Sequence, residues 1–350
     1  MFRKPIFLYL ISIFSAVFIV VLISFFIYKL KNKNYKLPPT TPTVVLPSPT
    51  PTPDPDRSFS ILLLGYAGAN HDGGGLTDSI ILSRIRPHDQ QIDLISIPRD
   101  LWVEVSPDKF TKINSILPLS GSEALKSVVA SISGETIEHH IAIDFNGFIK
   151  VVDILGGVDL KITRPFVDLF YPLDVGATDT CGKSPEEVTA LSATMSGEKL
   201  DHQFTCRYEQ LVMNIGTTHL DGATALKYAR SRHSEFDGGD FNRSNRQRQV
   251  LLAVRDKALN INIFPRIIPI FNTLKSHLRS DLSVSDLEKY LFRALEFSKY
   301  DINSISINDK NFLTQSYSSS RQSILIPRSG LNDYSEIRQF IATSSAVLEQ

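Results

Sequence analysis

Apolar and polar positions alternate along most of the chain in patterns that predict a mixed α/β domain. Short apolar runs predict strands at Phe59–Leu64, Ser79–Ile85, Gln91–Ile97, Val158–Ile162, Ile302–Ile307 and Ser323–Ile326. Helical spacing predicts helices at Ser122–Ile132, Asn146–Leu155, Asp221–Tyr228, Arg246–Leu259, Ser283–Phe297 and Tyr334–Leu348. Strands that alternate with helices favour an α/β fold in which helices flank a mixed sheet.

One segment departs from this alternation. Residues 166–217 are long and irregular, and they contain both cysteines of the chain, Cys181 and Cys206. We interpret the segment as an insertion with its own loop structure. A disulfide would close it, and such bonds form readily outside the cytoplasm and rarely within it. Two unpaired buried thiols are the alternative.

The N-terminal region is much more hydrophobic than the rest. Residues 6–28 form a run of 23 uncharged positions, most of them Ile, Leu, Val or Phe. A helix of this length spans roughly 35 Å, which is enough to cross the core of a bilayer. Lys29, Lys31 and Lys33 follow where a signal peptide would have its cleavage site. The pattern therefore predicts an uncleaved transmembrane anchor.

A linker is expected after the anchor. Residues 37–56 include eight prolines and five threonines. Repeated proline removes backbone donors and favours polyproline II, so we expect the folded domain to begin near Arg57. Arg3 and Lys4 precede the anchor whereas four lysines follow it, and this count alone favours a cytoplasmic C-terminal portion.

The composition argues against two classes of protein, general nucleic-acid binders and zinc fingers. Lys and Arg total 37, as do Asp and Glu, so the formal net charge is zero. A general nucleic-acid binder needs a strongly basic surface, and we expect no nucleic-acid partner. The two cysteines form no CxxC pair, which argues against a zinc finger.

The strongest chemical signal is a cluster of five arginines within nineteen residues. Arg230 and Arg232 are two apart, so in an extended segment they would point to the same side. Arg243 and Gln247 follow Asp240 and share a helix face near its N-terminus. Guanidinium groups that converge at a helix N-terminus make a site for phosphate or pyrophosphate. A solvated basic surface, paired with nearby acidic residues, is the alternative.

A second signal follows a predicted strand. Pro98 ends strand pairing, so Arg99 and Asp100 are expected at the C-terminal edge of the sheet, where α/β sheets usually bind ligands. A structural turn would explain the same pair, and Lys112 lies in the loop beyond.

A glycine-rich loop supplies a third signal. Its sequence lacks the GxxxxGK[ST] pattern, so no nucleotide loop is implied. Asp72 and Asp78 offer the hard oxygen ligands that Mg²⁺ takes together with substrate phosphates. A turn in which Asp78 caps the next element is the competing interpretation.

Together and in this order, these stretches resemble the LytR-CpsA-Psr (LCP) family of bacterial envelope proteins. The matching sequences are ILLLG (61–65), LTDSIILSRI (76–85), ISIPRDLWV (95–103), KIN (112–114), DFNGFIKVVDILGGVDL (144–160), HLDGATALKYARSRH (219–233) and DFNRSNRQRQ (240–249). Each motif is short, but seven in register behind a membrane anchor are highly specific.

The resemblance implies an activity and a location. Members transfer a glycopolymer from a polyprenyl-pyrophosphate carrier to peptidoglycan, with Mg²⁺ or Mn²⁺ as cofactor. Family topology implies a cytoplasmic N-terminus at 1–5, a single span of the cytoplasmic membrane at 6–28 and a linker at 29–56. The catalytic domain, 57–350, would then be extracytoplasmic, which is opposite to the orientation that the lysine count favours.

The resemblance also implies roles for individual residues. The family's residues near the pyrophosphate and in its closing motif correspond by position to Arg99, Lys112, Arg230, Arg232, Asp240, Arg243 and Gln247 of this chain. Asp78 matches the metal-binding aspartate. Ala67 stands where the family usually has a second aspartate, and Leu76 where it often has an arginine, so Asp72 is the candidate replacement for the missing carboxylate.

The mechanism that we expect is phosphoryl transfer. A metal ion and arginines hold the pyrophosphate while a sugar hydroxyl attacks, and Asp100 or Asp240 takes its proton. We expect an apolar groove for the isoprenoid tail along the helices near 144–155 and 250–270. A hydrolase of polyprenyl pyrophosphates and a non-catalytic scaffold that binds them are the alternatives.

Overall fold

The computed structural model describes residues 57–68, 74–173, 178–236, 240–260, 274–283, 286, 289, 290, 293 and 296–344. All of them belong to one compact unit, 53–350. The anchor predicted at 6–28 and the linker predicted at 29–56 lie outside these ranges. Within them, no helix is both long enough and apolar enough to span a membrane.

A six-stranded sheet forms the centre of the domain, with strand order β11-β6-β1-β2-β3-β12. The strands that share one direction are β1 (Phe59–Tyr66), β3 (Gln91–Ser96), β6 (Ile137–Asp144) and β12 (Asp301–Ser306). Those that run opposite are β2 (Thr77–Arg86) and β11 (Leu278–Ser280). The prediction of a mixed sheet is confirmed.

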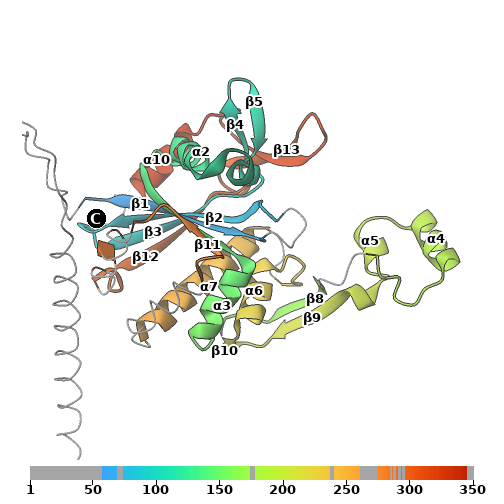
Figure 1. Cartoon of the computed structure of the whole chain (residues 1–350). Helices are drawn as coiled ribbons and strands as arrows, with labels where there is room; N and C mark the ends of the chain where they lie inside the picture. The colour runs from blue at the N-terminus through green and yellow to red at the C-terminus, as the bar shows by residue number, and fades with distance from the viewer. Residues whose placement is uncertain are drawn as a thin grey trace, which may run out of the picture. The chain divides into compact units, whose positions relative to one another are not determined.

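Helices cover both faces of this sheet (Figure 1). On one face lie α2 (Ile116–Ser133) and α10 (Ser335–Thr343), whose Leu125 and Ile337 pack with Leu62, Leu82 and Ile95 of the sheet. On the other lie α3 (Phe145–Ile154), α6 (Gly222–Arg230) and α7 (Asp240–Asn260). These three helices build a second core with the antiparallel pair of β7 (Val158–Ile162) and β10 (Gly216–Leu220).

The backbones of α3 and α6 approach closely at Gly222. A Cβ at this position would lie 2.3 Å from the carbonyl oxygen of Ile149. The position therefore requires glycine, and the contact packs the N-terminal end of α6 directly on α3, which fixes where the rest of α6 lies. This placement matters because Arg230 ends α6.

Helix boundaries differ from the predictions where polar residues begin an element. The helix predicted from Arg246 starts at Asp240, because the six residues before Arg246 are mostly polar and show no apolar period. The prediction from Ser122 is close, since α2 is kinked at Gly121, which has φ 83°. The last helix was predicted to reach Leu348, but α10 ends at Thr343.

The interpretation of residues 166–217 as irregular was wrong at both ends. β8 (Phe166–Pro172) and β9 (Tyr208–Met213) pair as an antiparallel ribbon that projects from the body of the domain (Figure 1). Its tip carries α4 (Pro185–Thr194) and α5 (Glu198–Asp201). Buried Phe166 and Leu211 anchor the base of the ribbon in the second core.

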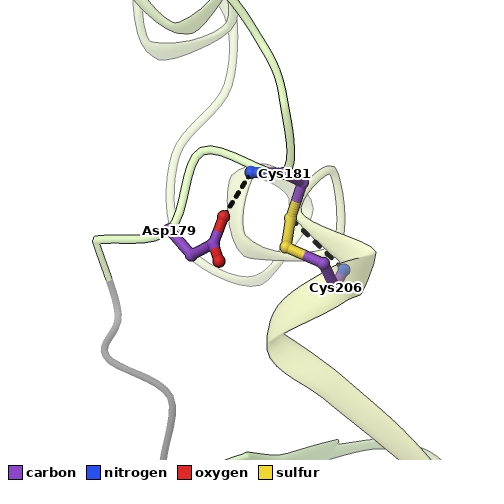
Figure 2. Close-up of side chains that lie close together, drawn as sticks. All are labelled: Asp179, Cys181 and Cys206. Atoms are coloured by element: carbon purple, nitrogen blue, oxygen red, sulfur yellow. Dashed lines mark hydrogen bonds between the residues drawn. A yellow bond between two sulfur atoms is a disulfide. The ribbon is translucent and has the colours of Figure 1, made fainter.

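A disulfide between Cys181 and Cys206 closes the tip of this arm. Of the two alternatives, a disulfide or two unpaired thiols, the structure therefore has the disulfide. Figure 2 shows Asp179 beside it, where the carboxylate accepts a hydrogen bond from the Cys181 backbone at 2.8 Å. Because both sulfurs are bonded to each other, this trio offers no thiolate to a metal ion.

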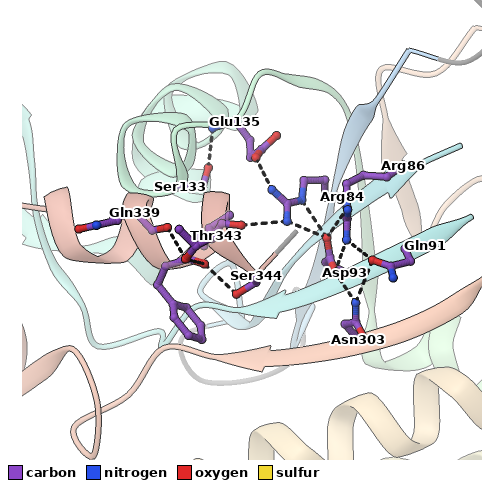
Figure 3. A network of polar contacts seen from close by, with 12 residues as sticks. Arg84, Arg86, Gln91, Asp93, Ser133, Glu135, Asn303, Gln339, Thr343 and Ser344 are labelled. Carbon is purple, nitrogen blue, oxygen red and sulfur yellow. Dashed lines mark hydrogen bonds and ion pairs between the residues drawn. The ribbon is translucent and has the colours of Figure 1, made fainter. Parts of the chain in front are cut away.

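A buried ion network holds the sheet and the first helical layer together (Figure 3). The carboxylate of Asp93, with no exposed surface, accepts from Arg84 at 2.9 Å and from Arg86 at 3.1 Å. Arg84 also reaches Glu135, which follows α2, and the carbonyl oxygen of Ile341 in α10. The network lies where β3 begins, so it supports the fold from the edge opposite the candidate site.

Candidate active site

The like-directed strands end at one edge of the sheet, and the predicted polar residues gather there. β2 begins at this edge because it runs antiparallel to its neighbours β1 and β3. Asp78 is the second residue of β2, while Arg99 and Asp100 follow the end of β3. The expectation that the Arg-Asp pair lies at a C-terminal strand edge agrees with this placement.

Arg99 joins two carboxylates at this edge. Its Nη1 donates to Asp78 Oδ1, and its Nε lies 3.5 Å from Asp100 Oδ2. The Nε is buried and forms no hydrogen bond within the described part of the chain. Lys112, the last residue of β5 (Lys109–Lys112), donates from Nζ to Asp100 Oδ1 at 2.7 Å. A buried donor without a hydrogen-bond partner in a charged group of this kind is typical of an anion site.

The surrounding cations lower the pKa of the Asp100 carboxyl. Burial raises this pKa, but the hydrogen bond from Lys112 and the charges of Arg99, Lys112 and Arg232 outweigh burial. Asp100 is therefore anionic at neutral pH. The charge of Arg232 also acts on this carboxylate.

These residues line a cavity of about 450 Å³. Helix α7 contributes Arg243 and Gln247, which lie one turn apart, and residues 306–310 after β12 form another wall. The predicted residues that share this cavity are Asp78, Arg99, Asp100, Arg243 and Gln247. Positions distant in the sequence thus meet in one chamber with charged walls.

An apolar groove of about 260 Å³ adjoins this chamber. Its floor is the sheet face on which Leu63, Ile81 and Ile141 of three neighbouring strands stand side by side. Its walls come from α3, α6 and α7, with Phe145, Phe148, Val151, Leu226, Ala229, Val250, Leu251 and Val254. Both helices expected to line an apolar groove, near 144–155 and 250–270, do so in their described parts.

The chamber and the groove meet at three residues, Asp78, Ser79 and Gln247, which line both. Arg230 lines the groove, and its guanidinium lies 4.4 Å from the ring centroid of Phe145. The premise that Arg230 and Arg232 share one side of an extended segment was wrong, because α6 ends at Arg230.

Not every predicted residue is placed. Asp72 lies in 69–73, outside the described residues. Asp240 is the first residue of α7, but only its backbone belongs to the described structure. Ala67 is buried at 6% exposure at the end of β1, so this position offers an apolar methyl where the family usually has a carboxylate.

Sequence reasoning did not single out Arg246. Its side chain is only 1% exposed, and it donates to the carbonyl oxygen of Tyr228 at 3.0 Å and to that of Ser231. These bonds fix the end of α6 on α7, and so position Arg230 and the loop with Arg232. The arginine-rich stretch contained the signal, but spacing did not distinguish the arginine that joins two helices from Arg243, which lines the cavity.

Arg248 was missed in the same way. It donates to the hydroxyls of Ser96 at 2.7 Å and Ser306 at 2.8 Å, and both serines line the chamber. Burial lowers the pKa of the Arg248 guanidinium. The side chain joins α7 to the ends of β3 and β12 and adds positive charge beneath the chamber.

The sequence matches the model of the LytR_cpsA_psr family over residues 25–326. The chain belongs to this family. Two curated family relatives are polyisoprenyl-teichoic acid–peptidoglycan teichoic acid transferases. TagU of Enterococcus faecalis is 26% identical over 235 residues, which are 66% of this chain and 64% of TagU. TagV of Bacillus subtilis is 25% identical over 234 residues, 66% of this chain and 51% of TagV. The match thus spans less than two thirds of the length of either relative.

Solved structures share the LytR_cpsA_psr fold. TagV of B. subtilis has a TM-score of 0.57 and 22% identity, and the match covers 83% of this chain and 97% of that chain. TagT bound to LIIa-WTA has a TM-score of 0.57 and 20% identity, with 84% and 93% covered. These likenesses establish the mixed α/β fold with a central mixed sheet.

Proposed function

We propose that this protein transfers a glycopolymer from a polyprenyl-pyrophosphate carrier to peptidoglycan. The observation that carries this proposal is the junction of a chamber lined by Arg99 and Arg243 with an apolar groove, at Asp78, Ser79 and Gln247. A carrier lipid has a pyrophosphate next to an isoprenoid chain, and each part has a matching surface here. The names of TagU and TagV describe teichoic acid transfer from a polyisoprenyl carrier, in agreement with this chemistry.

The cations around the junction would hold the pyrophosphate. Arg99 has a buried Nε without a hydrogen-bond partner in the described structure, and Arg243 comes from the first turns of α7. Arg230 stands at the groove side, and Arg232 and Lys112 at the Asp100 side. Planar guanidinium groups bind phosphate oxygens in pairs and stabilise the charge that grows on them during transfer.

The residues present fit a magnesium or manganese ion bound with its substrate. Asp78 offers a carboxylate in the wall shared by chamber and groove, and one or two carboxylates plus substrate phosphates are the usual Mg²⁺ ligands. Asp72 is the second candidate ligand. Such an ion supplies neutralisation of pyrophosphate charge, which the arginines share.

The reaction is an in-line displacement at the phosphorus next to the glycan. A peptidoglycan hydroxyl oxygen forms the new P–O bond, the bond from this phosphorus to the bridging oxygen breaks, and polyprenyl phosphate leaves with that oxygen. The hydroxyl proton passes to a carboxylate. We favour Asp240 for this role, because the lowered pKa of Asp100 makes that carboxylate a weak base that instead positions Arg99 and Lys112.

We further propose a location for the protein. Residues 1–5 would be cytoplasmic, 6–28 would span the cytoplasmic membrane once, and 29–56 would link the span to an extracytoplasmic domain at 57–350. The Cys181–Cys206 disulfide supports this orientation, because such bonds persist outside the reducing cytoplasm. Peptidoglycan and a lipid-linked glycan would both be within reach, and nucleic acid is not an expected partner.

A non-catalytic scaffold that binds pyrophosphate lipids is the second candidate. Buried, apolar Ala67 favours it, because this position lacks the carboxylate that the family usually has. A hydrolase would use the same chamber with water as the acceptor.

One assay separates the three functions. The full chain in detergent is incubated with a labelled lipid-linked glycan and Mg²⁺, with and without peptidoglycan. Transfer predicts label on peptidoglycan, a hydrolase releases glycan phosphate in both samples, and a scaffold binds the lipid without turnover. Arg99→Ala should abolish transfer, whereas Arg338→Ala, which removes an exposed arginine on α10, should not.

A further inference from the structure

A separate groove lies on the outer side of the chamber, between two hairpins. β4 (Trp102–Ser106) pairs with β5, and β13 (Leu313–Tyr317) pairs with β14 (Ser323–Pro327). The hairpins lie side by side at the top of Figure 1, and β4 contacts β14. The space between them measures about 490 Å³ and is lined by residues of both.

Three aromatic side chains dominate this groove: Trp102, Phe110 and Tyr317. The rings of Trp102 and Phe110 are inclined by only 11°, with centroids 6.5 Å apart, so they form one continuous surface. Tyr317 is 76% exposed at the end of β13. Aromatic rings clustered at a surface without a covering element are typical of a binding site rather than of a core.

The polar groups of the groove are mostly uncharged. Ser316, Ser318 and Ser319 bring hydroxyls, and Asp108 is the sole charged residue among the described residues that line it. Pyranose rings place C–H bonds on one face and hydroxyls around the rim, and the negative face of an aromatic ring attracts such C–H groups. The combination fits a chain of uncharged sugars, and an acidic lining without a cation disfavours a polyphosphate.

The groove adjoins the chamber through two connections. Ile324 of β14 lines both spaces. Lys112, which bonds to Asp100, stands directly opposite Trp102 in the β4–β5 pair. The apolar groove meets the chamber at Asp78, Ser79 and Gln247 instead, so lipid and sugar surfaces reach the chamber at different walls.

We propose that the groove between the hairpins binds the acceptor, the amino-sugar strand of peptidoglycan, and directs its hydroxyl into the chamber. This assignment rests on the proposed transferase function and adds the acceptor subsite to it. Trp102 and Phe110 stack on the sugar rings, Tyr317 closes the opposite side, and the serine hydroxyls bond to the rim of the sugar.

A fluorescence titration tests the groove without any catalysis. Trp102 is the single tryptophan of the chain, so its emission reports on this groove alone. The full chain in detergent is titrated with soluble glycan strands released from peptidoglycan, and in a second arm with a soluble teichoic acid freed of its carrier. No metal or lipid is added, so the result does not depend on whether the chamber is catalytic.

We expect a saturable change with peptidoglycan strands and none with teichoic acid. Tyr317→Ala should weaken binding roughly tenfold, because one stacked ring is lost. Tyr317→Phe keeps the ring and Ile215→Ala removes an exposed apolar side chain outside the groove, so both should bind like the natural protein.

Two results would overturn the assignment: an emission that stays unchanged with peptidoglycan strands, or equal affinity in Tyr317→Ala. A response to teichoic acid alone would reassign the groove to the donor and refute the acceptor role. Glycan binding by a protein that shows no transfer would contradict the proposed function while leaving the groove intact.

Discussion

A single glycine on the floor of the apolar groove allows the binding of the prenyl chain to be tested. Gly65 stands on the groove floor between Ser79 of β2 and Ile143 of β6. A Cβ there would have a single near neighbour, Ser79 Cβ at 3.3 Å, so β1 should accept a side chain with a small adjustment. A leucine at this position would occupy space that we assign to about four carbons of a prenyl chain, at about 0.8 kcal/mol each.

Gly65→Leu should therefore weaken the binding free energy of the prenylated lipid by roughly 3 kcal/mol, which is a loss of affinity of roughly a hundredfold. Calorimetry on the full chain in detergent would compare farnesyl pyrophosphate with inorganic pyrophosphate. The variant should lose affinity for the prenylated ligand and keep its affinity for inorganic pyrophosphate, because the chamber is unchanged. Gly65→Ala, which adds one carbon, should fall between the two proteins.

Two results of this calorimetry would differ from the expected one. If both ligands weaken equally, the substitution has damaged the chamber or the fold, which a melting curve would show. If farnesyl pyrophosphate binds the variant as tightly as the natural protein does, the prenyl chain does not lie in this groove.

Three further outcomes are expected. Arg99→Ala should lower transfer by roughly a thousandfold with little change in melting temperature, and Arg99→Lys should recover only part of the rate, since an ammonium cannot bridge two groups as a guanidinium does. EDTA should abolish transfer and Mg²⁺ restore it, whereas full activity in the chelator would remove the metal from the mechanism. Burial raises the pKa of Asp281, but Lys126 and His140 lower it well below the usual 3.8. The ionised carboxylate therefore stabilises the folded state above that pH, and this stabilisation is lost as the pH falls. Urea unfolding of Asp281→Asn should therefore show a deficit at pH 7 that shrinks below pH 4.

The central strands were predictable because their chemistry is local. β1, β2 and β3 are short runs of Ile and Leu with clear boundaries, and the structure has them within two residues of the predicted ends. β6 was missed because Ile137–Asp144 carries two histidines and a glutamate among its apolar positions. Such a strand is recognisable only from its place beside β1.

Of the strands that form the outer groove, β14 was predicted at Ser323–Ile326, but β4, β5 and β13 were missed. β4 has a single buried residue and β5 has none, so neither has the apolar alternation that marks a half-buried strand. Their pairing with each other, and the contact of β4 with β14, arise only in the folded domain.

For the candidate site, the sequence by itself determined which side chains carry charge and which lie at strand or helix ends. Arg99 and Asp78 could be expected at one sheet edge because strand direction places them there. Folding alone decided that Arg243 of α7 faces the same chamber as Arg99, and that Arg246 bonds to the carbonyl oxygens at the end of α6 instead. Residue type is a local property, whereas the wall that a side chain faces depends on how helices pack on the sheet, and no spacing within one segment encodes that packing.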